Sequence, residues 1–73
     1  MNIGMLWLDA DQMRPFDEKV SRAADYYREK YGRSPELCYV NNKMLAEEKS
    51  IGRIEVKPIK SVQVNHFWLG MKA

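Results

Sequence analysis

Cysteine is almost absent from this chain, which has one, Cys38, among 73 residues. A single cysteine cannot close an internal disulfide, which excludes the small secreted scaffolds that disulfides hold together. Long apolar runs are also missing, and no segment approaches the roughly 18 residues that span a membrane. The N-terminal segment has neither the basic residues nor the apolar run of about seven to fifteen residues of a secretory signal peptide. These absences predict a cytoplasmic protein that does not enter a membrane.

A strong charge of either sign is missing as well. Twelve lysines and arginines face ten aspartates and glutamates, for a formal net charge of +2, and the two signs are interleaved along the chain. So mild a charge favours an ordinary solvated surface over nucleic-acid binding. Because aromatic strands flanked by basic residues are typical of RNA-binding sheets, a weak nucleic-acid-binding domain remains an alternative.

The clearest pattern in the sequence predicts a helix over residues 15–31, "PFDEKVSRAADYYREKY". Its apolar residues recur at steps of three and four and form one stripe. Pro15 suits the first turn, and Gly32 can adopt the left-handed conformation that follows a last turn. The stripe predicted to face the core consists of Phe16, Val20, Ala23, Ala24, Tyr27 and Tyr31.

Four strands are predicted, at residues 5–9, 36–41, 53–59 and 62–71, the last with a break near Asn65. The apolar run 5–9 indicates a strand paired on both sides, and 36–41 an interior strand. Residues 41–52 are interpreted as a connection that contains a short helical turn.

A strand, a helix and a strand in succession indicate a βαβ unit with parallel strands and a right-handed crossover. The predicted fold is therefore α+β. It comprises a βαβ unit plus two further strands, in one mixed sheet with a single main helix on one face. Residues 1–73 form one small domain.

Polar residues fall where the predicted strands end. Asp9 and Asp11 follow the first strand, and Asn41 and Asn42 end the second. If the last strand runs antiparallel to the first, His66 begins at the same edge, where open α/β sheets bind ligands. The edge is then a candidate site for a small ligand or a divalent cation. The competing interpretation is that strand ends are polar simply because they meet water.

Chemistry at two other motifs is not expected. "LWLDADQ" resembles the strand that presents the nucleophile of haloacid-dehalogenase-type phosphohydrolases, but those enzymes need a much larger sheet. Cys38 lies within an apolar strand, where cysteine usually behaves as a small buried hydrophobe. Cys38 and His66 would supply two ligands, whereas a structural zinc site needs four. Apart from the alternative of a divalent cation at the strand edge, the sequence thus predicts no catalytic residue, no metal site and no cofactor.

Aromatic residues are concentrated on the predicted strands. One helix cannot cover both faces of a sheet, so Phe67 is expected under the helix, with Trp7 and Trp68 on the opposite face. An uncovered aromatic face marks an interaction surface, unless loops cover it. Trp7 and Trp68 are therefore the interface candidates, and the predicted partner is a second copy or another protein.

Two further segments, "YGRSPELCYVN" and "NHFWLG", resemble parts of short, uncharacterised bacterial proteins of unknown function. This resemblance implies no activity. From the residues, we expect a small non-enzymatic interaction or accessory module that uses an exposed aromatic sheet face.

Overall fold

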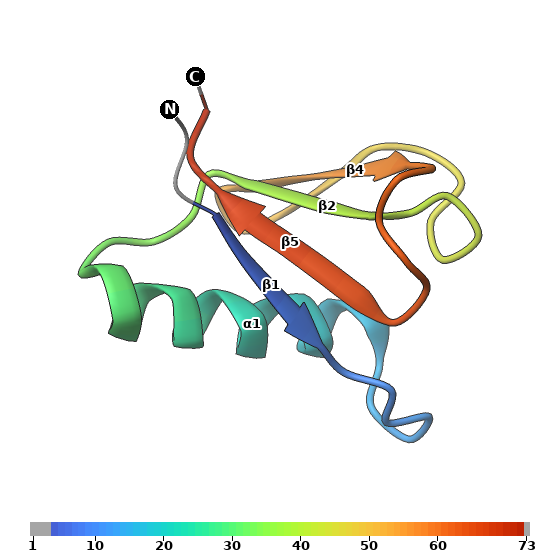
Figure 1. Ribbon diagram of the computed structural model, residues 1–73, viewed down its shortest axis with the longest axis horizontal. Helices are drawn as coiled ribbons and strands as arrows, with labels where there is room; N and C mark the ends of the chain where they lie inside the picture. Colours follow the sequence, from blue (N-terminus) through green and yellow to red (C-terminus); the bar gives the residue numbers. More distant parts are fainter. Residues whose placement is uncertain (1–3, 73) are drawn as a thin grey trace.

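One helix packs on one face of a five-stranded mixed sheet (Figure 1). The computed structural model describes residues 4–72. Its elements are β1 (Gly4–Leu8), α1 (Phe16–Tyr31), β2 (Leu37–Asn41), β3 (Lys49–Ile51), β4 (Ile54–Ile59) and β5 (His66–Gly70). This arrangement confirms the predicted α+β class and the single main helix.

The helix α1 follows the sequence signals closely. It begins directly after Pro15, which has extended backbone angles, and ends at Gly32, whose φ of 78° is left-handed. The Gly32 N–H donates to the Arg28 carbonyl at 2.8 Å and closes the last turn. All six stripe residues lie in the core or pack against it, as predicted. Within residues 4–72, no helix is long and apolar enough to cross a membrane.

The sheet order is β1-β5-β2-β4-β3. Strand β5 is antiparallel to both β1 and β2, so those two strands run parallel to each other with β5 between them. The predicted parallel direction of the first two strands is therefore confirmed, and the direction of the last strand, which the sequence left open, is antiparallel to both. The two parallel strands of a βαβ unit need not be adjacent, so β5 can pair with both of them from a position between them.

Strand β1 lies at one edge of the sheet, so the expectation that it pairs on both sides is wrong. Its apolar density has another cause. Met5 and Trp7 pack against the core, whereas Leu6 and Leu8 point to the other face and are each 60% exposed. An apolar run can thus reflect two apolar faces rather than two paired edges.

Strand β3 was not predicted, because residues 41–52 were interpreted entirely as a connection. It has only three residues, and two of them, Lys49 and Ser50, are polar and exposed. Its composition does not predict a strand, and antiparallel pairing with β4 is what holds these three residues in an extended conformation. Gly52, at a φ of 61°, begins the two-residue turn that joins Ile51 to Ile54. A glycine with positive φ in this position is what a type II′ hairpin turn requires.

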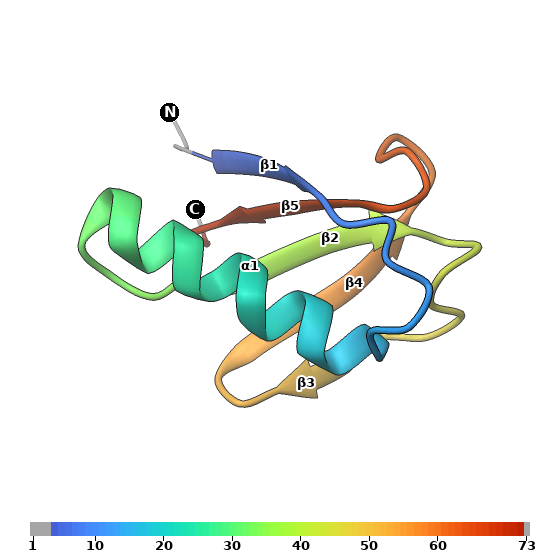
Figure 2. The same ribbon diagram turned by 90° about the horizontal axis from the view of Figure 1, so that it is seen from below.

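The core lies between α1 and the sheet (Figure 2). Val20, Val40, Val56, Phe67 and Leu69 are completely buried there. Cys38 is buried among them, as predicted, and burial raises the pKa of its thiol to about 12. The thiol is therefore neutral at physiological pH, whereas a nucleophilic cysteine reacts as the thiolate.

Candidate interaction surface

The face of the sheet turned away from α1 carries a mainly apolar surface, here called the open face. No helix among residues 4–72 covers it (Figure 1). Strand alternation places on it every second residue of each strand. Its apolar and aromatic members are Leu6 and Leu8 of β1, Tyr39 of β2, Ile59 of β4 and Trp68 of β5, and its polar members include His66 of β5 and the charged Glu55 and Lys57 of β4.

A shallow depression of about 530 Å³ lies in the open face. Tyr39 and Trp68 form part of its lining, with ring centroids 5.7 Å apart and planes tilted by 41°. Ser61, Gln63 and His66 add polar groups along one side. A half-covered aromatic pair with a polar margin resembles the composition of protein interaction surfaces, where aromatic residues supply most of the binding energy.

Trp68 depends on a glycine in the neighbouring edge strand. A Cβ built at Gly4 would overlap the six-membered ring of Trp68, so the ring occupies the space that a side chain at this position would fill. Gly4 belongs to β1 and Trp68 to β5, and Leu6 is the residue directly opposite Trp68. The missing side chain at Gly4 therefore leaves room for the indole on the open face.

We expect Gly4→Ala to displace the Trp68 ring and to lower the free energy of unfolding by about 1–2 kcal/mol, the usual cost of overpacking. A double-mutant cycle with Trp68→Ala tests the cause by thermal or urea unfolding. In the Trp68→Ala background the ring is gone, so Gly4→Ala should cost much less. Equal costs in the two backgrounds would contradict the proposed contact.

Trp7 does not lie on the open face, so the expectation that both tryptophans share it is wrong. The Trp7 ring stacks on Tyr26 of α1, with centroids 4.2 Å apart and planes 24° apart. Alternation along β1 explains the error, because Trp7 is one residue from the exposed Leu6 and Leu8 and so points to the helix side. Phe67 packs under the helix, as predicted, with its ring 5.9 Å from that of Phe16.

The predicted polar edge exists, because β1 and β2 end where β5 begins (Figure 1). Its side chains, however, do not converge on one point. Strand β5 separates Asp9 from Asn41 by two strand spacings, which is roughly 9–10 Å. The group also divides into a carboxylate pair after β1 and an asparagine pair after β2.

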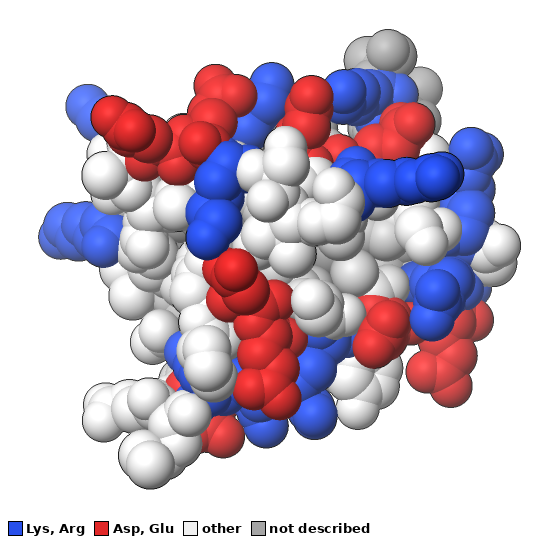
Figure 3. All heavy atoms as spheres, turned by 180° about the vertical axis from the view of Figure 1, so that it is seen from behind, with Lys and Arg blue, Asp and Glu red and all other residues white. Residues whose placement is uncertain are grey.

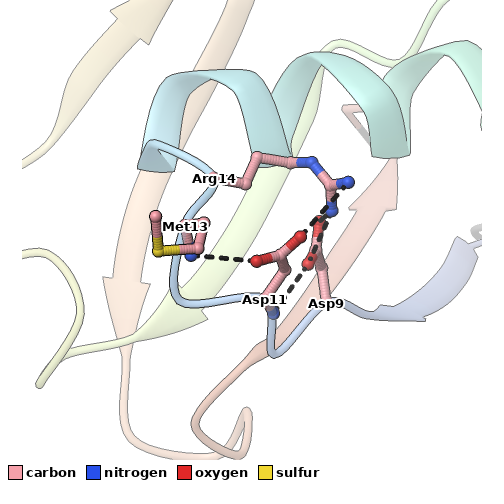
Figure 4. A network of polar contacts seen from close by, with 4 residues as sticks. All are labelled: Asp9, Asp11, Met13 and Arg14. Carbon is pink, nitrogen blue, oxygen red and sulfur yellow. Dashed lines mark hydrogen bonds and ion pairs between the residues drawn. The ribbon is translucent and has the colours of Figure 1, made fainter.

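The carboxylate pair binds an arginine of the same loop (Figure 4). Arg14 Nη1 donates to Asp9 Oδ2 at 2.9 Å and to Oδ1 at 3.1 Å, and Arg14 Nη2 lies 3.5 Å from Asp11 Oδ2. The Asp11 N–H donates to Asp9 Oδ1 at 3.1 Å, and the Met13 N–H donates to Asp11 Oδ1 at 2.9 Å. The Asp-x-Asp motif therefore closes the loop between β1 and α1.

Electrostatics keep Asp9 ionised although it is one of the buried residues. Burial alone would raise its pKa. The hydrogen bonds from the Asp11 N–H and from Arg14, together with the positive charges of Arg14 and Lys19, outweigh burial and hold the pKa below the usual aspartate range. Arg14 was not predicted as a partner of these carboxylates, although its position three residues after Asp11 could have indicated the pair.

The other residues of the edge also bond within the chain. Asn41 Nδ2 donates to the Val62 carbonyl at 2.8 Å, and Asn41 Oδ1 accepts from the Lys43 N–H at 2.8 Å. The Asn42 N–H donates to the Ile59 carbonyl at 3.1 Å. His66 Nδ1 lies 3.0 Å from the Val64 carbonyl. Among the described residues, no three His, Cys, Asp or Glu side chains are grouped so as to hold a metal ion.

On the side shown in Figure 3, Lys and Arg side chains lie among Asp and Glu side chains, around a centre of residues that carry no charge. Such a surface offers few phosphate contacts. Comparison of the chain with protein-family models, with curated proteins and with solved structures finds no match.

Proposed function

We propose that this chain is a small, non-enzymatic interaction module of the cytoplasm, which uses the open face of its sheet. The observation that carries the proposal is the pair Leu6 and Leu8, each 60% exposed, beside the aromatic pair Tyr39 and Trp68. Covering these leucine side chains with a partner is favourable by about 25 cal/mol for each Å² of apolar surface removed from water. A partner protein, above all a second copy, is the occupant that fits an apolar and shallow surface.

The alternatives have less support. A ligand or cation at the polar edge would have to displace hydrogen bonds that Asp9, Asp11 and Asn41 already make within the chain. A nucleic acid would meet acidic side chains among the basic ones. Neither cost applies to a protein partner that covers Leu6 and Leu8.

Self-association through this surface should be visible as a concentration dependence. We expect sedimentation to show a dimer as the protein is concentrated from the micromolar to the millimolar range. NMR signals from Leu6, Leu8 and the Trp68 indole should shift over the same range. Trp68→Ala should weaken the association, because it removes the largest ring of the open face.

Trp7→Ala removes the same kind of side chain from the helix side of β1, where Trp7 stacks on Tyr26, so it should lower the free energy of unfolding as well as weaken association. A chain that sediments as a monomer throughout, with open-face signals that do not change, would contradict self-association.

A further inference from the structure

The hydrogen-bonding direction of β1 follows from one bond beyond its end. The Asp9 N–H donates to the Asn65 carbonyl at 2.9 Å, and these residues continue the register one step past Leu8 and His66. Hydrogen-bonded and non-bonded pairs alternate along an antiparallel ladder. Trp7 and Met5 therefore exchange hydrogen bonds with β5, whereas Leu6 and Leu8 point their backbone groups away from it.

A second bond agrees with this assignment. The Gly70 carbonyl accepts from the Glu36 N–H at 3.0 Å, so Gly70 turns its polar groups away from β1 and from its partner Gly4. Gly4, Leu6 and Leu8 thus present their N–H and C=O groups along the outer edge. Within residues 4–72, the one bond to this row is weak: the Tyr31 hydroxyl lies 3.4 Å from the Gly4 carbonyl.

The opposite edge of the sheet is protected in ways that β1 is not. Strand β3 has only three residues, with Lys49 and Ser50 exposed. Where β3 stops, the outer side of β4 carries Pro58. The backbone groups of Glu55 and Ile59 form hydrogen bonds on the β2 side of β4. Because backbone groups alternate along a strand, Pro58 faces the outer edge, and proline has no N–H to donate there. Short strands, lysine and proline are the usual protections of a sheet edge.

Strand β1 has none of these protections. Its sequence, "GMLWL", contains no charge and no proline, and two of its three residues with an outward backbone, Leu6 and Leu8, carry exposed side chains. An apolar edge strand with an unpaired backbone is a template for another strand. The partner that it fits best is one whose own edge has the same length, the same lack of charge and the same free groups.

We propose that a second copy of the chain pairs with β1 in antiparallel register, around a two-fold axis at Leu6, so that two five-stranded sheets become one. This rests on the proposed function of an interaction module and names its partner and contact. Leu6 lies opposite the second copy's Leu6, and Gly4 lies opposite the second copy's Leu8. Each of these pairs exchanges hydrogen bonds in both directions, because all three residues point outward.

The side chains fit this register. Opposite residues of an antiparallel pair lie on the same face. The second copy's Leu8 therefore lies on the open face beside Gly4, where the ring of Trp68 occupies the space left by the glycine. On the helix side, Trp7 lies opposite the second copy's Met5, over the groove that Met5 and Trp7 form with Tyr26. The interface is short, so we expect a dissociation constant on the order of micromolar or weaker.

Amide hydrogen exchange of the unmodified chain tests the contact residue by residue. In the monomer, the Met5 and Trp7 amides are protected by β5 and those of Leu6 and Leu8 are not. Above the dissociation constant measured by sedimentation, the Leu6 and Leu8 amides should exchange at least about tenfold more slowly. The rates at Met5 and Trp7 serve as the internal reference.

Two variants separate the edge from the face. Leu6→Pro removes an outward N–H that the β5 ladder does not use, and it should abolish the dimer. Tyr39→Ala removes an aromatic side chain from the open face but no backbone group from the edge, so it should weaken the dimer less than Leu6→Pro does. Circular dichroism checks that each variant is folded, and if Leu6→Pro is not, the exchange rates of the unmodified chain decide.

The possible failures differ. A dimer in which the Leu6 and Leu8 amides exchange as fast as in dilute protein would overturn edge pairing and leave the proposed function standing. A dimer lost in Tyr39→Ala and retained in Leu6→Pro would also overturn edge pairing. It would favour face-to-face stacking of the two sheets and leave the proposed function standing. A monomer at every concentration would overturn edge pairing and self-association together.

Discussion

Replacing Tyr27 with alanine is expected to lower the free energy of unfolding by about 3 kcal/mol or more. Tyr27 is 2% exposed, lies in the middle of the buried stripe of α1, and packs its ring 4.7 Å from that of Tyr31. Its loss would leave a cavity between the helix and the sheet. Because a domain of this size has little stability in reserve, we expect a large drop in the midpoint of thermal or urea unfolding.

Tyr26→Ala is the matched control for this measurement. It is the same chemical change at the neighbouring position of the same helix, so the intrinsic helix preference changes equally. Tyr26 is 44% exposed, and its main contact is the stack on Trp7. Its removal should cost about 1 kcal/mol. Equal losses for the two variants would mean that the buried face of α1 has been assigned wrongly.

Removing Arg14 is expected to destabilise the fold clearly more than removing an exposed arginine of α1 such as Arg22. Arg14→Ala would leave the buried carboxylate of Asp9 without its cation. An ionised group left buried without its partner is strongly destabilising, whereas Arg22 makes no ion pair within the described residues. Thermal melts of Arg14→Ala and Arg22→Ala at neutral pH test this, and similar midpoints would argue against the pair.

The same pair predicts an acid dependence of stability. The folded pKa of Asp9 lies below its unfolded value of about 3.9. The stabilisation is therefore complete above that value and is lost as the pH falls through the folded pKa. Asp9→Asn should be less stable than the unmodified chain at neutral pH, and the difference should shrink below about pH 4.

The contribution of Asp9 can be separated from that of another carboxylate in the same window. A hydrogen bond from Lys72 lowers the pKa of Glu55, so Glu55 also loses stabilisation in acid. The difference between the unmodified chain and Asp9→Asn cancels this effect, because both proteins contain Glu55. A difference that does not vary with pH would contradict the assigned role of Asp9.

The ends and the buried face of α1 could be predicted from the sequence alone. Pro15, Gly32 and the spacing of apolar residues act within a few positions of one another, so their effect does not depend on the rest of the fold. The burial of Cys38 and the predicted break near Asn65, whose φ is 68°, were local in the same sense, although β5 begins only after this break, at His66, and residues 62–65 form no strand.

Only the tertiary structure decided which strands are neighbours and which face each aromatic residue occupies. The insertion of β5 between β1 and β2 depends on pairing between residues more than sixty positions apart, such as Met5 and Leu69, which no local pattern encodes. The side of Trp7 changes with a shift of a single residue, because strand side chains alternate with a period of two. The edge position of β1, and with it the outward backbone of Leu6 and Leu8, follows from that long-range pairing, because a free edge is a property of the whole sheet and not of the strand.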